Sequence, residues 1–220
     1  MLKNYKIANY LEEGFLGGPQ KRIIFTTKYL DRNINSTVII PKKNSDKFSN
    51  QLEINNIKYI KVGINKLSKD INLLLSYIFF FLPEVFKLTL LFKNNNYDII
   101  HLSGGIWQFK GAIAAIFARK KFVWQLNDTH CPFILKIPYY FLHRLSKKII
   151  FSSIETQKYY SNITSSKVSS IVIPSGVDTS FYNPNNEYDL DIYYKNIFKN
   201  KLIFGMVTNI NSIKGVDHFI

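Results

Sequence analysis

The sequence predicts an α/β fold, a Rossmann-like parallel sheet with helices on both faces. Short apolar runs alternate with longer helical patterns along most of the 220 residues, which is the order expected of strand–helix–strand units. Runs such as Asp98–Leu102 are apolar at successive positions, which is typical of strands buried on both faces. A hydrophobic content of 46% is enough for an ordinary buried core.

Eight strands and five helices follow from these patterns. The strands are predicted at Lys6–Asn9, Thr37–Ile40, Lys58–Val62, Asp98–Leu102, Lys121–Leu126, Lys148–Phe151, Ser170–Ile173 and Leu202–Val207. The helices are predicted at Pro19–Leu30, Asp70–Lys93, Trp107–Arg119, Phe133–Ser146 and Ile154–Ser161.

The strand–helix rhythm breaks near Pro174. The turn-rich stretch Pro174–Asp178 and the polar stretch Asn183–Asn186 are typical of a linker between domains. We therefore expect an N-terminal domain over residues 1–175 and a linker over 176–200. Residues 201–220 would then be the first strand and helix start of a truncated second Rossmann-like domain, because one strand and one helical turn cannot bury a core.

The chain is strongly basic, with 29 Lys and Arg against 15 Asp and Glu and a formal net charge of +14. This charge favours an anionic partner such as phosphate, nucleic acid or acidic lipid. No basic run interleaved with stacking aromatics lies on a recognisable module, so nucleic acid is not expected. The single cysteine, Cys131, excludes an internal disulfide framework, and the N-terminus lacks a secretory signal pattern, so a cytoplasmic location is expected.

The first candidate motif is Gly17-Gly18-Pro19, between the first strand and the first helix. Gly17 and Gly18 would let the backbone approach an anion, and Pro19 suits the first helical turn. A phosphate at this helix N-terminus is one interpretation, and a tight turn is the other.

The second candidate lies at the carboxyl end of a predicted strand, where ligands of open α/β sheets bind. Asp128 would orient a sugar hydroxyl there, while Asn127 and His130 would contact the same substrate. The alternative interpretations are a helix cap for Asp128, ahead of Phe133, and a plain loop position for His130.

The third candidate is the pair Lys214-Gly215, between the predicted strand of the second domain and its helix. A lysine beside a helix N-terminus is suited to neutralising a leaving diphosphate, and Gly215 would let the backbone approach it. A surface turn is the alternative.

The fourth candidate is the apolar, aromatic-rich segment Lys66–Lys93, which is rimmed by lysines. Pro83, Glu84 and Lys87 in its second half argue against a membrane span. Such a surface could rest on an anionic membrane, or it could be a core helix kinked at Pro83.

Taken in order, several blocks resemble the retaining glycosyltransferases of family 4. They are Gly17-Gly18-Pro19, Tyr97–His101, Val172–Asp178 with Phe181 and Pro184, Phe204–Val207 and Lys214–Asp217. The block Ile173-Pro174-Ser175-Gly176-Val177-Asp178, followed by the strand and the Lys-Gly pair, is the most specific part.

The resemblance implies a GT-B architecture, in which two Rossmann-like domains face each other across the active site. The first domain would hold the acceptor and the second the nucleotide-sugar donor, with no metal or other cofactor. The resemblance also assigns Gly17, Gly18, Lys214 and Gly215 to the donor phosphates. Charge developing on that diphosphate would be stabilised by fixed amide donors and one lysine.

This chain departs from the family pattern at three places. Asn209 stands where many members have a phosphate-binding arginine, and Asn127 where many have a histidine. The paired glutamates that hold the donor sugar are absent, so the 220 residues alone are not expected to catalyse transfer.

The basic charge and the apolar segment fit enzymes that work at the cytoplasmic membrane face on lipid-linked saccharides. The expected function is sugar transfer to such an acceptor in bacterial cell-surface polysaccharide biosynthesis, peripheral at the inner face of the plasma membrane. Two alternatives remain open, namely another GT-B-like enzyme such as a nucleotide-sugar epimerase, and a truncated non-catalytic module that binds membrane or acceptor.

Overall fold

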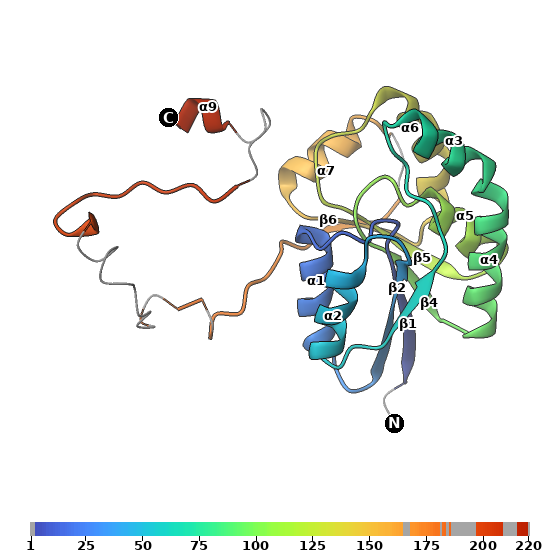
Figure 1. The fold of residues 1–220 in the computed structure, drawn as a ribbon. Helices are drawn as coiled ribbons and strands as arrows, with labels where there is room; N and C mark the ends of the chain where they lie inside the picture. The colour runs from blue at the N-terminus through green and yellow to red at the C-terminus, as the bar shows by residue number, and fades with distance from the viewer. Residues whose placement is uncertain are drawn as a thin grey trace. The chain divides into compact units, whose positions relative to one another are not determined.

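The chain forms two compact units, Met1–Val177 and Asp178–Ile220. The structure, a computed structural model, describes residues 3–164, 168–180, 182–183, 185, 197–208 and 215–219. Figure 1 shows the sheet and its helices in the first unit, which carries nearly all of the regular structure among these residues. Each unit is considered by itself.

The first unit is built on a seven-stranded parallel sheet with the order β3-β2-β1-β4-β5-β6-β7. The chain begins in the middle of the sheet, moves out to one edge, and then returns past β1 to the other. The carboxyl ends of β1 and β4 therefore flank a switch point, which is where open α/β sheets bind ligands. The strands are β1 Tyr5–Tyr10, β2 Ile34–Pro41, β3 Tyr59–Val62, β4 Ile99–Leu102, β5 Lys121–Leu126, β6 Lys148–Phe151 and β7 Ser170–Val172.

Helices cover both faces of this sheet, as predicted (Figure 1). On one face lie α1 Gly18–Lys28 and α2 Asp46–Ile54, which pack on a core of their own. The helices α4, α5, α6 and α7 contribute to the larger core on the other face. The bounds of the remaining helices are α3 Ile71–Phe79, α4 Phe81–Asn94, α5 Phe109–Phe117, α6 Phe133–Leu142, the 3-10 turn His143–Leu145, and α7 Ile154–Ser161.

Strand β2 shows how one apolar run serves both cores. Val38 and Ile40 lie in the core under α1 and α2, whereas Ile39 lies in the core under α4 and α5. All three are fully buried. Because successive side chains of a strand point to opposite faces, a strand covered on both faces can be apolar at successive positions, as β2 is at 38–40. The α/β prediction, with a parallel sheet covered on both faces, is therefore confirmed.

The structure differs from the sequence-based elements in three places. Helix α2 was not predicted, because Asp46–Ile54 carries few apolar residues and buries only Phe48, Ser49 and Leu52. The predicted helix Asp70–Lys93 is two helices, and its break falls at Phe80 rather than at Pro83. Pro83 lies in the first turn of α4, where a missing amide costs no helical hydrogen bond.

The third difference lies in the second unit. Residues 201–208 are described without strand structure, so the strand predicted at Leu202–Val207 is not formed. Leu202 and Val207 are almost fully exposed, and a strand gains its hydrogen bonds and burial only from neighbouring strands. The short helix α9, Val216–Phe219, begins directly after Gly215.

No single helix among the described residues is long and apolar enough to cross a membrane. Helices α3 and α4, bent by 56° at their break, reach that length and apolar composition only as a pair.

A row of polar side chains crosses the sheet on the face covered by α1. The Asn9 amide donates to Ser36 Oγ at 2.8 Å, and Asn9 Oδ1 lies 2.6 Å from Nδ1 of His101. One orientation of the Gln125 amide satisfies the hydrogen bonding of both its neighbours. In it the nitrogen donates to His101 Nε2 at 2.9 Å and the oxygen accepts from Arg22 on α1. His101 thus holds its proton on Nδ1 and accepts at Nε2. Burial lowers the pKa of His101 to about 4, and the nearby Arg22 charge lowers it further.

This row predicts a pH-dependent stability. The imidazole of His101 stays neutral in the fold down to about pH 4, whereas in an unfolded chain a histidine takes up a proton near pH 6.5. Its contribution is therefore fully present above pH 6.5 and is lost as the pH falls toward 4, by at most about 3 kcal/mol. We expect urea unfolding at pH 7 and pH 4.5 to show a smaller loss of stability for His101→Gln than for the unchanged chain. Equal losses in the two proteins would contradict this assignment.

Candidate functional site

The loop between β1 and α1 is closed by a glutamine rather than by the glycines themselves. Gln20 Oε1 accepts from the Gly17 amide at 3.1 Å, and Gln20 Nε2 donates to the Glu13 carbonyl at 3.0 Å. Gln20 is buried, and Pro19 occupies the first turn of α1. The Gly17 amide is therefore engaged within the loop, while amides of the first helical turn have no partner inside the helix.

Neither glycine is required by backbone geometry or by packing. Gly17 has an extended backbone, with φ −127° and ψ −163°. A Cβ at Gly18 would meet no atom within 4 Å, and one at Gly17 would meet only Gln20 Oε1 at 3.3 Å. Gly111 differs, because a Cβ there would lie 2.4 Å from the Tyr10 ring, so this glycine lets α5 pack closely on β1. Open space at Gly18 leaves room for a ligand beside the backbone.

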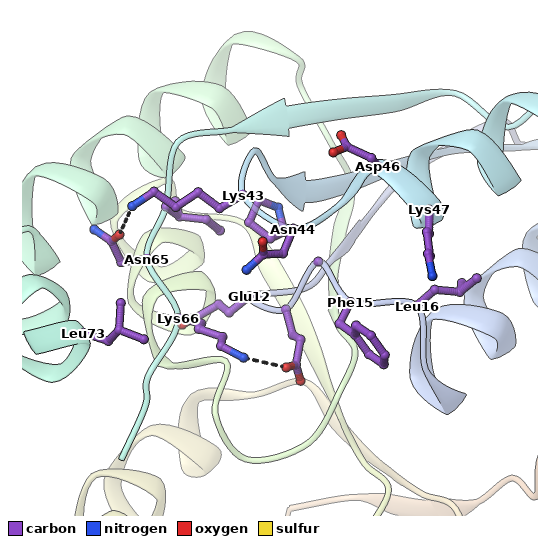
Figure 2. Close-up of a pocket in the computed structure, with 14 residues that line it drawn as sticks. Glu12, Phe15, Leu16, Lys43, Asn44, Asp46, Lys47, Asn65, Lys66 and Leu73 are labelled. Atoms are coloured by element: carbon purple, nitrogen blue, oxygen red, sulfur yellow. Dashed lines mark hydrogen bonds and ion pairs between the residues drawn. The ribbon is translucent and has the colours of Figure 1, made fainter. Parts of the chain in front are cut away.

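Two cavities adjoin this loop at the carboxyl edge of the sheet. The first, of about 510 Å³, lies beyond the ends of β1, β2 and β3. Its lining includes Lys43, Lys47 and Lys66 (Figure 2). Lys66 pairs with Glu13 at 3.0 Å, and Lys43 reaches toward Asn65. The cavity is lined by Glu12, Glu13, Gly14, Phe15, Leu16, Pro41, Lys43, Asn44, Asp46, Lys47, Ile64, Asn65, Lys66 and Leu73.

The second cavity, of about 440 Å³, has mainly apolar walls and shares Glu12, Glu13 and Lys66 with the first. Leu74 of α3 and Ile134 of α6 both line it. The other lining residues are Leu11, Pro19, Gln20, Leu67, Ser68, Lys69, Gly104, Trp107, Gln108, Pro132 and Leu135. The site thus joins a lysine-rimmed cavity of mixed lining to a more apolar one at the switch point of the sheet.

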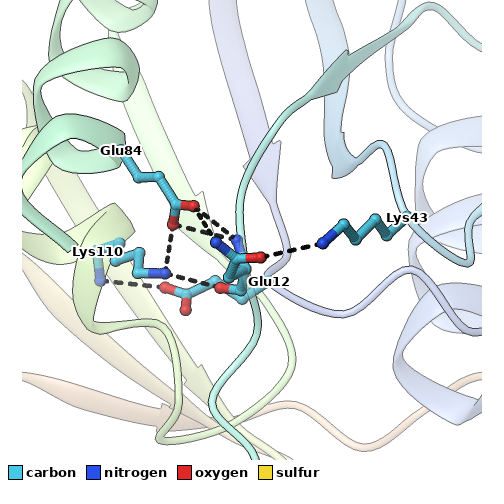
Figure 3. A network of polar contacts seen from close by, with 5 residues as sticks. Glu12, Lys43, Glu84 and Lys110 are labelled. Carbon is cyan, nitrogen blue, oxygen red and sulfur yellow. Dashed lines mark hydrogen bonds and ion pairs between the residues drawn. The ribbon is translucent and has the colours of Figure 1, made fainter. Parts of the chain in front are cut away.

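A buried ion pair holds the walls of both cavities. Lys110 Nζ lies 2.5 Å from Glu84 Oε2, with side chains 0% and 7% exposed. The same ammonium donates to the Asn65 carbonyl at 2.7 Å and lies 3.6 Å from the centroid of the Tyr77 ring. Figure 3 shows this network, in which Glu84 also accepts from the backbone and side-chain amides of Asn65.

Glu12 joins this network to the β1–α1 loop. Its backbone amide donates to Gln108 Oε1 at 3.0 Å, and its Oε1 accepts from the Lys110 amide at 3.1 Å, in the first turn of α5. Burial raises the pKa of Glu12 to about 8, although the Lys110 charge and amide oppose the shift. Its second oxygen, Oε2, is buried without a hydrogen-bond partner.

The loop after β5 lies at the same edge. Asn127 is held by Ser152, whose hydroxyl donates to its carbonyl at 3.0 Å, and its side chain lies 2.8 Å from that of Gln125. Asp128 and His130 are exposed, and Asp128 Oδ1 accepts from the His130 amide at 3.3 Å. Partial burial of the carboxyl raises the pKa of Asp128, and His130 opposes the shift. No side chain caps α6, whose N-cap is Pro132, so the cap interpretation of Asp128 is not observed.

The predicted site residues fall into two groups. Gly17, Gly18, Asn127, Asp128 and His130 all belong to loops that follow parallel strands of one sheet, and their roles stay predictions. Gly215 has φ +63° and belongs to the second unit, while Lys214 and Asn209 lie outside the described residues. No cluster of three or more His, Cys, Asp or Glu side chains suited to a metal occurs in the described part of the chain.

Sequence reasoning missed Lys110, Glu84 and Glu12 as a group. A usable signal was present at Lys110, which is the lone charge within the apolar run that became α5. A fully buried charge is rare unless it is paired.

The buried pair gives a stability prediction. Lys110→Met leaves Glu84 without its countercharge, and removing one partner of a buried pair costs about 3–5 kcal/mol. We expect urea unfolding to show such a loss, and the double variant Lys110→Met/Glu84→Gln to recover part of it. Lys158→Met serves as the control, since its pair with Glu155 is exposed and is worth about 0.5 kcal/mol or less. Equal effects at Lys110 and Lys158 would contradict the network.

Comparison with known proteins gives the fold a family. A model described as Glycosyltransferase Family 4 matches residues 16–181. No curated protein matches the chain.

Several solved structures share the fold at low sequence identity. Alr3699/HepE from Anabaena, in complex with UDP and glucose, is 22% identical with a TM-score of 0.65, and the match covers 81% of this chain and 46% of that one. A glycosyltransferase from Rickettsia africae is 19% identical with a TM-score of 0.68, covering 90% and 49%. The lipopolysaccharide outer core galactosyltransferase WaaB is 16% identical with a TM-score of 0.58, covering 79% and 46%.

The chain thus spans about half the length of the structures that it matches, and its seven-stranded unit has the Rossmann-like fold of their GT-B architecture. Since the family model matches most of the sequence, the chain belongs to Glycosyltransferase Family 4.

Proposed function

We propose that this chain is the acceptor-side part of a retaining glycosyltransferase that moves a sugar from a nucleotide-sugar to a lipid-linked saccharide. The product class is bacterial cell-surface polysaccharide, made by a cytoplasmic enzyme peripheral to the inner face of the plasma membrane. We propose that the reaction needs no metal. We also propose that these 220 residues alone do not catalyse it, because they lack the paired glutamates expected of the family.

One observation carries the acceptor assignment: an apolar cavity and a lysine-rimmed cavity meet at the switch point of the sheet. A lipid-linked saccharide combines an apolar chain, a phosphate group and a sugar. The apolar walls from Leu74 and Ile134 suit the lipid tail of the acceptor, and Lys66 and Lys69 suit its phosphate group. The lysine-rimmed cavity suits its sugar. Asp128, Asn127 and His130 would then orient the acceptor hydroxyls.

The donor assignment rests on Gly18 and on the related structures. Open space beside the Gly18 backbone, at a helix N-terminus, suits a donor phosphate. Structures of HepE hold UDP and UDP-glucose. In this proposal Gly17 supports the loop, while Lys214 and Gly215 of the second unit face the diphosphate.

The exposed apolar faces of α3, α4 and α6 support a membrane-bound enzyme. Phe79 of α3, Leu82 of α4 and Phe133 of α6 are 78%, 71% and 79% exposed. The two helices α3 and α6 both border the apolar cavity, so a lipid tail leaving it would meet the same apolar surface. Lysines near this surface suit acidic headgroups. Other exposed apolar side chains on it are Ile71, Leu75, Ile78, Phe80, Phe86, Ile134, Ile137 and Phe141.

The acceptor assignment can be tested by binding. The probe is a short-chain polyprenyl pyrophosphate carrying one sugar, with affinity measured by fluorescence titration. We expect Leu74→Asp to weaken binding at least about tenfold, because a charge in an apolar wall costs well over 1.4 kcal/mol.

Ile54→Asp is the matched control, since Ile54 is 64% exposed at the end of α2 on the other face of the sheet. Equal binding by both variants and the unchanged chain would remove the acceptor assignment.

The membrane assignment can be tested by co-sedimentation with vesicles. We expect binding to vesicles with about one third phosphatidylglycerol, and at least a tenfold loss for the double variant Phe79→Ser/Phe133→Ser, because burying each aromatic ring contributes about 1.5–3 kcal/mol. The matched variant Tyr29→Ser, 62% exposed beyond α1, should bind like the unchanged chain. Equal sedimentation of the unchanged chain, the double variant and Tyr29→Ser would contradict the assignment of α3 and α6 to the membrane-binding surface.

A second candidate is a nucleotide-sugar epimerase. Two UDP-N-acetylglucosamine 2-epimerase structures share the fold, with TM-scores of 0.50 and 0.52. An epimerase has no lipid acceptor, so the binding experiment above separates the two functions.

A further inference from the structure

Arg22 reaches from α1 to the segment by which the chain leaves the sheet. Its NH2 group donates to the Ile173 carbonyl at 2.6 Å, and its NH1 group donates to Ser175 Oγ at 3.2 Å. Ile173 and Ser175 follow β7 directly and precede Val177, the last residue of the first unit. One side chain thus holds both ends of the tripeptide that contains Pro174.

The same guanidinium is held from the sheet. With the Gln125 amide nitrogen on His101, the Gln125 oxygen accepts from Arg22 NH1 at 2.9 Å and from Nε at 3.0 Å. His101 in turn contacts Asn9, which contacts Ser36. A continuous polar row therefore runs from β2 across β1, β4 and β5 to Arg22 and the exit segment.

These contacts use most of the hydrogen-bonding capacity of Arg22. A guanidinium carries five N–H donors in a fixed fork, and four are directed at Gln125, Ser175 and the Ile173 carbonyl. A cavity of about 380 Å³ lies beside it, lined also by Gly18 and Asn127. An arginine that bound an anion in this cavity would keep its N–H groups free for the anion. The contacts of Arg22 therefore favour a structural role within the protein.

We propose that Arg22 is a positioning residue that fixes the path of the chain out of the first domain and ties it to the Gly17-Gly18 loop. Arg22 lies one turn after that loop on α1, so the loop, the centre of the sheet and the exit segment move as one body. The consequence for catalysis rests on the proposed function, because the chain passes from the acceptor-side domain toward the donor-binding one through this segment. Lysine cannot replace this arginine, since an ammonium lacks the planar fork.

Hydrogen exchange measured by mass spectrometry on the 220-residue chain tests the anchor. The probe is the Ile173 amide, which donates to the Phe151 carbonyl at 2.8 Å. We expect Arg22→Gln to raise exchange there about tenfold or more, since it removes charge-assisted hydrogen bonds. Arg22→Lys should restore protection only in part.

Lys21→Gln is the matched control, because Lys21 is the exposed neighbour on α1 and loses the same charge. Its exchange should equal that of the unchanged chain. The anchor is overturned if the Ile173 amide exchanges alike in Arg22→Gln and Lys21→Gln.

Ser175→Ala covers the case in which Arg22→Gln unfolds the domain. Ser175 is exposed, so its loss leaves the core intact and removes one acceptor of Arg22. Exchange of the Ile173 amide should still rise about threefold, and unchanged exchange there would overturn the proposal. The measurement needs neither donor nor acceptor, so its failure would count against the anchor and not against the transferase assignment.

Discussion

Because the Lys110 ammonium is fully buried, its charge must be balanced inside the fold, and this requirement fixes the ligand-facing edge of the first domain. The balancing groups come from different elements: Glu84 from α4, the Asn65 carbonyl from the loop after β3, and the Tyr77 ring from α3. Glu12, after β1, binds the amide of the same lysine. A shift of any of these elements would leave a buried charge unpaired, which costs several kcal/mol. The cavity walls therefore hold their shape without a ligand.

The two faces of the sheet carry different polar systems, and this division separates two tasks. The Lys110 network lies with α3, α4 and α5, beside the cavities. The row through His101 lies under α1 and ends on Arg22 at the exit segment. Period-two alternation makes the division possible, because Ile100 and Leu102 face the larger core while His101 faces α1. The cavity walls and the exit segment are thus supported by separate polar systems.

The sheet could be predicted from the sequence because strands buried on both faces carry runs of successive apolar residues, and such runs are visible one by one. Helix α2 could not, since it rests on three buried side chains and satisfies the rest with solvent. The site was predicted only as loops. The partners of Lys110 come from segments 26 and 45 residues away, and no local pattern specifies such pairings. The break at Phe80 was likewise hidden, because proline is the stronger local signal for a kink.

The buried pair of Lys110 and Glu84 and the walls of both cavities are formed by residues of the first unit. The described residues of the second unit differ, since Leu202 and Val207 lie almost fully exposed and need neighbouring strands to bury them. Arg22 fixes Ile173 and Ser175 through a group that the sheet itself holds. The exit segment is therefore held from the centre of the first sheet, next to the Gly17-Gly18 loop.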